Sequence, residues 1–188
     1  PLYDVATELL LVPYSVDPRW HRLSHAAGLS GDDVGLNRFE PRHFAILGGP
    51  LAAGPPADGV WSTQQVAAKV APPGSGVIPT LLRVLNANYV PTRLRLTTEQ
   101  GAPARIARVI AHDGRPFRDT SSRTGDSPPL ADDELVTDTL AFGSAERYDL
   151  LLHPPSAGTY LLHLDWSDWR SDEQDPPIAR RTVRIVAG

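Results

Sequence analysis

The chain has 188 residues, of which 41% are apolar and 21% are charged, and its formal net charge is −4. This length suits one domain with an apolar core, and the basic residues are too scattered for the patch of a nucleic-acid-binding protein. The absence of cysteine excludes disulfides, thiolate metal ligands and cysteine nucleophiles, and no apolar run reaches the about 18 residues of a membrane span.

The first elements predicted along the chain are a strand and a short helix. Residues 6–16 are expected to form a strand that is apolar on both faces and broken near Pro13. The Asp-Pro pair at residues 17–18 is a typical helix start, and we expect one or two helical turns, with Gly28 and Gly31 ending them. Further strands are predicted at residues 43–49, 64–70, 80–89, 92–99, 104–112, 135–142, 146–152, 159–166 and 179–188.

Short strands without a long helical period predict an all-β domain, and a Greek-key β-sandwich is the expected architecture. The 15 glycines and 19 prolines are spread along the chain, as many short strands with turns require. Residues 115–134 and the acidic stretch 167–177 are predicted to be polar loops. Because the chain starts at Pro1 and contains no methionine, we expect residues 1–188 to be a single domain excised from a longer protein.

Residues 146–152 and 159–166 alternate most regularly, and a hairpin-length connection separates them. One face of each strand is apolar, and we expect these faces in the core: Tyr148, Leu150 and Leu152, then Tyr160, Leu162, Leu164 and Trp166. If the strands pair as a hairpin, Asp149 lies opposite His163 on the polar face. Arg147 then lies opposite Asp165, which gives a second cross-strand charge pair.

His163 and Asp165 stand two residues apart, and three interpretations are open: a metal site, a catalytic pair, or the polar face of a sheet. The register just described favours the polar face. Nothing else in the chain indicates a catalytic site, because neither a Gly-x-Ser-x-Gly nucleophile elbow nor a phosphate-binding glycine loop is present.

Four sequence blocks, in order, resemble the second cupredoxin domain of three-domain multicopper oxidases, the group that includes laccases and bilirubin oxidases. The blocks are ELLLVPYSVDPRWH, RVLNANYVPTRLRL, RVIAHDGRPF and SAERYDLLLHPPSAGTYLLHL, which start at residues 8, 83, 108 and 144. The resemblance runs from about residue 5 to about residue 165. It implies a cupredoxin-like fold, and the segment 115–134 and the acidic tail have no clear place in the pattern.

The resemblance also implies what the strand at residues 158–166 would carry in a copper-bearing domain. There, two outer histidines bind the trinuclear copper cluster and a middle cysteine binds the type 1 copper. In this chain the three positions are His163, Leu164 and Asp165, so we expect degenerate ligand positions and no copper, cofactor or catalytic residue. His21 and His25 could share a helix face, but no third ligand stands nearby. His112 is expected to shape the turn that follows it.

The resemblance then implies a structural role within a larger protein. The expected partners are flanking cupredoxin domains that carry copper, in an exported oxidase that takes single electrons from its substrates and reduces oxygen to water. Two alternatives stay open: a domain of a copper-less scaffold protein of the cell envelope, and a stand-alone binding module. In the long segment 19–42 we expect four apolar residues to pack on a neighbouring domain: Trp20, Leu23, Leu36 and Phe39.

Overall fold

The computed structural model describes residues 3–31, 39–50, 63–117, 136–168, 170 and 175–188, and within these the side chains of Ser24, His25, Ala26, Pro50 and Val136 are not described. The elements are η1 (Val5–Thr7), β1 (Leu9–Val16), α1 (Pro18–Ser30), β2 (His43–Pro50), β3 (Gln65–Ala68), β4 (Thr80–Leu85), β5 (Thr92–Thr98), β6 (Ala107–His112), β7 (Arg115–Pro116), β8 (Val136–Thr137), β9 (Thr139–Phe142), β10 (Arg147–Leu152), β11 (Gly158–Trp166) and β12 (Ala179–Ala187). The predicted loop 115–134 begins with the short strand β7, and its residues from 118 onward lie outside the described residues, as do residues 169 and 171–174 of the predicted loop 167–177.

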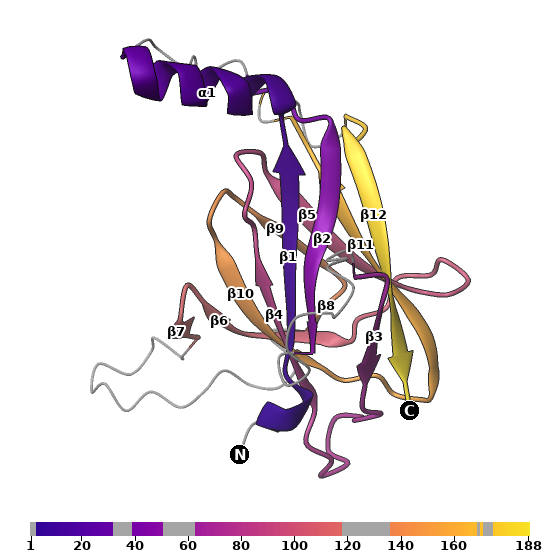
Figure 1. The fold of residues 1–188 in the computed structure, drawn as a ribbon. Helices are drawn as coiled ribbons and strands as arrows, with labels where there is room; N and C mark the ends of the chain where they lie inside the picture. The colour runs from indigo at the N-terminus through magenta and orange to yellow at the C-terminus, as the bar shows by residue number, and fades with distance from the viewer. Residues whose placement is uncertain (1–2, 32–38, 51–62, 118–135, 169, 171–174) are drawn as a thin grey trace.

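The strands form two sheets that face one another as a sandwich (Figure 1). The β1 sheet has the order β2-β1-β4-β10-β6-β7, with β8 also paired to β6, and the β11 sheet has the order β3-β12-β11-β5-β9. The pairs β1–β4 and β12–β3 are parallel, and the other ladders are antiparallel. The prediction of an all-β sandwich is confirmed. No helix in the described part of the chain has the length and apolar character needed to cross a membrane.

The core lies between the two sheets and is made of the apolar faces that alternation predicts. Leu150, Leu162 and Leu164 are each 0% exposed, as is Trp166, whose ring centroid lies 5.3 Å from that of Phe44. Burying side chains of this size stabilises the fold by about 1.5–3 kcal/mol each. The predicted core faces of residues 148–152 and 160–166 are therefore confirmed, although Tyr148 is only partly buried.

The predicted hairpin between residues 146–152 and 159–166 is wrong. β10 lies in the β1 sheet between β4 and β6, whereas β11 lies in the other sheet between β12 and β5. The proposed pairs Asp149–His163 and Arg147–Asp165 therefore do not form. Two adjacent prolines, at residues 154–155, cannot donate to a hairpin ladder. The segment crosses the sandwich instead, and it is anchored where the backbone N–H of His153 donates to the carbonyl of Ile106.

β1 continues through Pro13, so the predicted break does not occur. The carbonyl of Pro13 accepts hydrogen bonds from the backbone N–H of Ala87 at 3.1 Å and from Nδ2 of Asn88 at 2.8 Å. The ring nitrogen lies on this same side of the strand, where the β4 ladder ends after Leu11. Because the β4 ladder needs no N–H donor from β1 at this position, the proline costs no ladder hydrogen bond and is tolerated within the strand.

α1 is longer than predicted, with 13 residues from Pro18 to Ser30. Asp17 caps its start, and Gly31 ends it in the left-handed conformation at φ 76°, so both predicted boundary signals act. Gly28 does not end the helix. The helix lies at the end of the sandwich opposite to the last residues of β12 (Figure 1).

The predicted strand 135–142 is in fact two strands, since β8 pairs with β6 in one sheet and β9 with β5 in the other.

Candidate functional site

The side chains of His163, Leu164 and Asp165 on β11 lie in two different environments. Leu164 points between the sheets and is fully buried, while His163 and Asp165 lie on the outer face of the β11 sheet. In the ladder, His163 lies opposite Thr182 of β12 and Arg95 of β5. The strand therefore turns one of the three positions inward and two outward.

His163 is held between two threonines. Its Nε2 lies 3.1 Å from Oγ1 of Thr97, and its Nδ1 lies 2.9 Å from Oγ1 of Thr182. Burial lowers the pKa of His163, and the charges of Arg95 and Arg180 lower it further, whereas Asp165 acts in the opposite direction. The structure thus favours a neutral imidazole whose two nitrogens are both hydrogen-bonded within the sheet.

Asp165 is the shared counter-ion of two arginines. It is 5% exposed, and its Oδ2 accepts from Nε of Arg95 at 3.1 Å and from Nη2 of Arg180 at 2.9 Å. Nε of Arg180 also donates to Oδ1, so this arginine is bidentate. Burial disfavours the charged carboxylate, but the hydrogen bonds from Arg180 and Arg95 outweigh this effect and hold the pKa of Asp165 below its usual value.

The donor atoms of this strand do not fit a copper site. A blue-copper centre needs a thiolate and two imidazoles, whereas Leu164 has no donor atom and both oxygens of Asp165 are engaged by guanidinium groups. Among the described residues, no group of three or more histidine, aspartate or glutamate side chains is placed to hold a metal ion.

The other histidines considered in the sequence lie elsewhere. His21 and His25 are one turn apart on α1, and the side chain of His25 is outside the described residues. His112 stacks on Tyr148 with ring centroids 4.4 Å apart, beside the Asp113 turn. Its Nε2 lies 3.5 Å from Oδ2 of Asp113 and 3.6 Å from Oε1 of Glu146. His112 therefore joins the turn after β6 to the start of β10.

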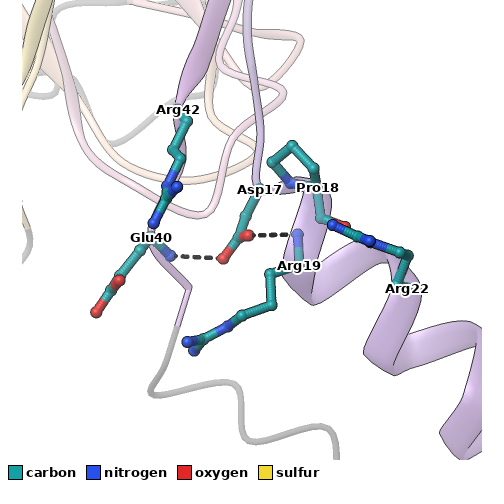
Figure 2. Close-up of a pocket in the computed structure, with 6 residues that line it drawn as sticks. All are labelled: Asp17, Pro18, Arg19, Arg22, Glu40 and Arg42. Atoms are coloured by element: carbon teal, nitrogen blue, oxygen red, sulfur yellow. Dashed lines mark hydrogen bonds between the residues drawn. The ribbon is translucent and has the colours of Figure 1, made fainter.

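A pocket of about 210 Å³ lies where β1 passes into α1 and where the chain returns toward β2 (Figure 2). It is lined by Asp17, Pro18, Arg19, Arg22, Glu40 and Arg42. We call this the arginine pocket. Asp17, which is 3% exposed, joins its two sides. Its Oδ1 accepts from the backbone N–H of Arg19 at 2.9 Å and of Trp20 at 3.0 Å, and its Oδ2 accepts from that of Glu40 at 2.9 Å.

An aromatic cluster adjoins the arginine pocket. Trp20 lies with its ring centroid 5.7 Å from that of Phe39 and 5.2 Å from that of Tyr89, and the last two are 5.2 Å apart. Sequence reasoning named Trp20 and Phe39 but missed Tyr89, which belongs to the loop after β4. It also missed the arginine pocket, whose only sequence signal is the Asp-Pro helix start at residues 17–18. Leu23 is 44% exposed, and Leu36 lies outside the described residues.

A scan of protein-family models and a search of curated protein sequences each find no match to this chain. Solved structures do match. A blue copper oxidase from Nitrosomonas europaea aligns with a TM-score of 0.51 at 17% identity, over 96% of this chain and 43% of that one. A multicopper oxidase from Campylobacter jejuni gives 0.49 at 14% over 96% and 29%, and a laccase from B. aclada gives 0.48 at 16% over 95% and 28%.

The chain spans less than half the length of the N. europaea oxidase. At an identity of 17%, this likeness shows the fold and not the activity. The two-sheet topology and this structural likeness lead to one conclusion: the described residues have the cupredoxin-like β-sandwich fold that is found in multicopper oxidases.

Proposed function

We propose that this chain is the copper-free middle domain of a laccase-like multicopper oxidase. Its role is to bridge the two flanking cupredoxin domains, which hold the copper ions that carry out one-electron oxidation and the reduction of oxygen to water. The single observation that carries the proposal is the state of β11. This strand keeps one inward and two outward positions at residues 163–165, but fills them with a buried leucine and with side chains that are bound to their neighbours in the sheet.

The chemistry of the three positions supports a structural role for this face. Leu164 contributes to the core, and Asp165 ties β11 to β5 and β12 through Arg95 and Arg180. His163 makes a second tie between the same strands through its two threonine contacts. The strand that would hold copper in a catalytic domain thus stabilises the sheet here. We expect the whole protein to be exported, as the sequence resemblance implies.

Copper titration of the 188-residue chain, followed by metal analysis after desalting, tests the proposal. We expect far less than one copper per chain and no oxidation of a phenol such as 2,6-dimethoxyphenol. A polypeptide extended by its natural flanking sequences is expected to retain copper and to oxidise the same phenol. Stoichiometric, tightly held copper in the 188-residue chain contradicts the proposal. An extended chain without copper favours the scaffold alternative.

A further inference from the structure

The arginine pocket contains three guanidinium groups, and the positive charge of one of them, Arg19, helps to lower the pKa of Asp17. Within the described residues, the guanidinium groups of Arg19, Arg22 and Arg42 form no ion pair with a carboxylate, and Arg22 donates only to the carbonyl of Pro18. The carboxylate of Asp17 accepts hydrogen bonds from three backbone N–H groups. Figure 2 shows that Arg42 and Arg19 come to the pocket from opposite sides of Asp17. Planar guanidinium groups without a partner are well suited to bidentate binding of a carboxylate.

The aromatic cluster continues this surface, because it is built on the same two segments. Trp20 follows Arg19, and Phe39 precedes Glu40. Tyr89 completes the cluster through a tilted contact with Trp20 and an edge contact with Phe39, and it remains 58% exposed. Tryptophan, tyrosine and arginine are the residues most enriched in the energetic centres of protein interfaces.

α1 adds basic and apolar side chains to the same end of the molecule. Its sequence from Pro18 to Ser30 contains no aspartate or glutamate. Leu23 is 44% exposed and Leu29 is 81% exposed, although the helix is more than three turns long. In Figure 1 the helix extends beyond the sandwich and does not lie flat on either sheet.

We infer that the arginine pocket and the aromatic cluster together dock a carboxylate-bearing segment of a neighbouring domain of the same polypeptide. The inference rests on the proposed function, which supplies the neighbouring domain, and charge complementarity selects an acidic partner. One glutamate or aspartate side chain enters between Arg19 and Arg42. An apolar or aromatic side chain next to it packs against Trp20 and Tyr89.

Such a contact needs only weak intrinsic affinity. Two domains joined by a short linker face each other at an effective concentration of about a millimolar, so a millimolar dissociation constant is enough to keep the segment bound. Since the arginines are exposed, the contact is expected to weaken as ionic strength rises. A titration that detects millimolar binding is therefore the suitable test.

The probe is the synthetic peptide acetyl-Gly-Glu-Phe-Glu-Gly-amide, titrated into the ¹⁵N-labelled 188-residue chain and followed by two-dimensional NMR. The control peptide carries glutamine at both glutamate positions. We expect the acidic peptide to shift the backbone amides of the non-proline residues within 17–22 and 39–42, and the control peptide to bind at least about tenfold more weakly. Inorganic phosphate is a third ligand, included to separate a simple anion site from a peptide-binding surface.

Two protein variants complete the test. The double variant Arg19→Gln with Arg42→Gln is expected to weaken binding of the acidic peptide by about tenfold or more. The variant Arg115→Gln, on exposed β7, changes the net charge away from the pocket and is expected to stay within about twofold of the parent chain. A folded spectrum for each variant excludes loss of structure as the cause.

The inference is overturned by no shifts with the acidic peptide, by equal binding of the control peptide, or by equal loss of binding with Arg115→Gln. Phosphate binding as tight as that of the peptide also overturns it, because it indicates a site for simple anions. Each of these results leaves the proposed function standing if the chain still takes up no copper. Stoichiometric copper binding removes the proposed function whatever the peptide does.

Discussion

Asp165 and Arg180 lie directly opposite each other in the ladder between β11 and β12, and the guanidinium group of Arg180 contacts both carboxylate oxygens of Asp165. Arg95 reaches the same carboxylate from the other neighbouring strand, β5. One buried carboxylate thus joins three strands of the β11 sheet. Its two arginines, at 34% and 48% side-chain exposure, keep part of their hydration, whereas the Asp165 side chain is only 8% exposed.

This difference in exposure predicts unequal effects of removing the two sides of the ion pair. Asp165→Asn leaves two arginines that can turn to water, and we expect a loss of about 1–2 kcal/mol in the free energy of unfolding. Arg95→Gln combined with Arg180→Gln leaves a buried carboxylate without a counter-charge, and we expect a loss of about 3 kcal/mol or more. Urea unfolding at pH 7 measures both. Asp168→Asn, which breaks a local surface pair with Arg170, is the control and is expected to change little.

His163 predicts a pH dependence of stability. Its pKa in the folded chain lies below the ordinary value of 6.5. As the pH falls below 6.5, His163 of the unfolded chain binds a proton that the folded chain does not bind. The free energy of unfolding therefore decreases until His163 is protonated in the folded chain as well. We expect His163→Gln to lose less stability between pH 7 and pH 5 than the unchanged chain does. Equal losses in urea unfolding of the two proteins contradict this expectation.

Asp17 predicts a local effect at the start of α1. Asp17→Ala removes the acceptor for three backbone N–H groups, and we expect a loss of about 2 kcal/mol. Asp17→Asn keeps one oxygen as a cap but places an amide N–H₂ against a backbone donor, so its cost is expected to be intermediate. Urea unfolding followed by circular dichroism measures this order. A cost for asparagine equal to that for alanine contradicts the account.

The ionised state of Asp17 also has a predicted pH window. Burial opposes the charge of Asp17, but the hydrogen bonds from the backbone of Glu40, Trp20 and Arg19 outweigh it and lower the pKa below the ordinary value of 3.8. The resulting stabilisation is present above pH 3.8 and is lost as the pH falls through the folded pKa. Acid titration of Asp17→Ala is therefore expected to show a smaller loss of stability below pH 4 than the unchanged chain.

Leu164→Cys tests whether a thiolate is the only missing part of a copper site. The new thiol would lie in the core, away from His163, which points to the outer face. No cluster of metal ligands surrounds this position in the described part of the chain, so we expect no blue-copper absorption after Cu²⁺ is added. A strong thiolate-to-copper band with one copper per chain contradicts this prediction.

Alternation along a single strand was the most reliable guide from sequence to structure. It correctly placed Leu162, Leu164 and Trp166 in the core, because a strand in a sandwich must bury one face. It did not identify the partner strands, since an apolar face is equally satisfied within one sheet or across two. For this reason the sequence predicts Arg147 as the partner of Asp165. Its actual partners are Arg95 of β5 and Arg180 of β12, the two strands that flank β11 in its sheet.

The arginine pocket was not predictable for a related reason. Arg19 and Arg42 are separated by more than twenty residues, and they meet because the carboxylate of Asp17 binds both the start of α1 and the backbone of Glu40. A capping aspartate is visible in a sequence, but its second oxygen can bind any backbone N–H that the fold brings near. Tyr89 joined the aromatic cluster in the same way, through the loop that follows β4.

The crossing of the chain between β10 and β11 has a consequence for how this domain comes together. β10 and β11 follow one another in the chain but belong to opposite sheets, and neither sheet is built from a contiguous stretch of chain: β1 and β10 share one sheet, and β3 and β12 share the other. Most pairings join residues far apart in sequence, as in slow-folding β-sandwiches. A chain cut within residues 153–157 would lose β11 and β12, and the β1 sheet would then lack two strands of the layer that it packs against, so we expect the described strands to unfold as one cooperative unit.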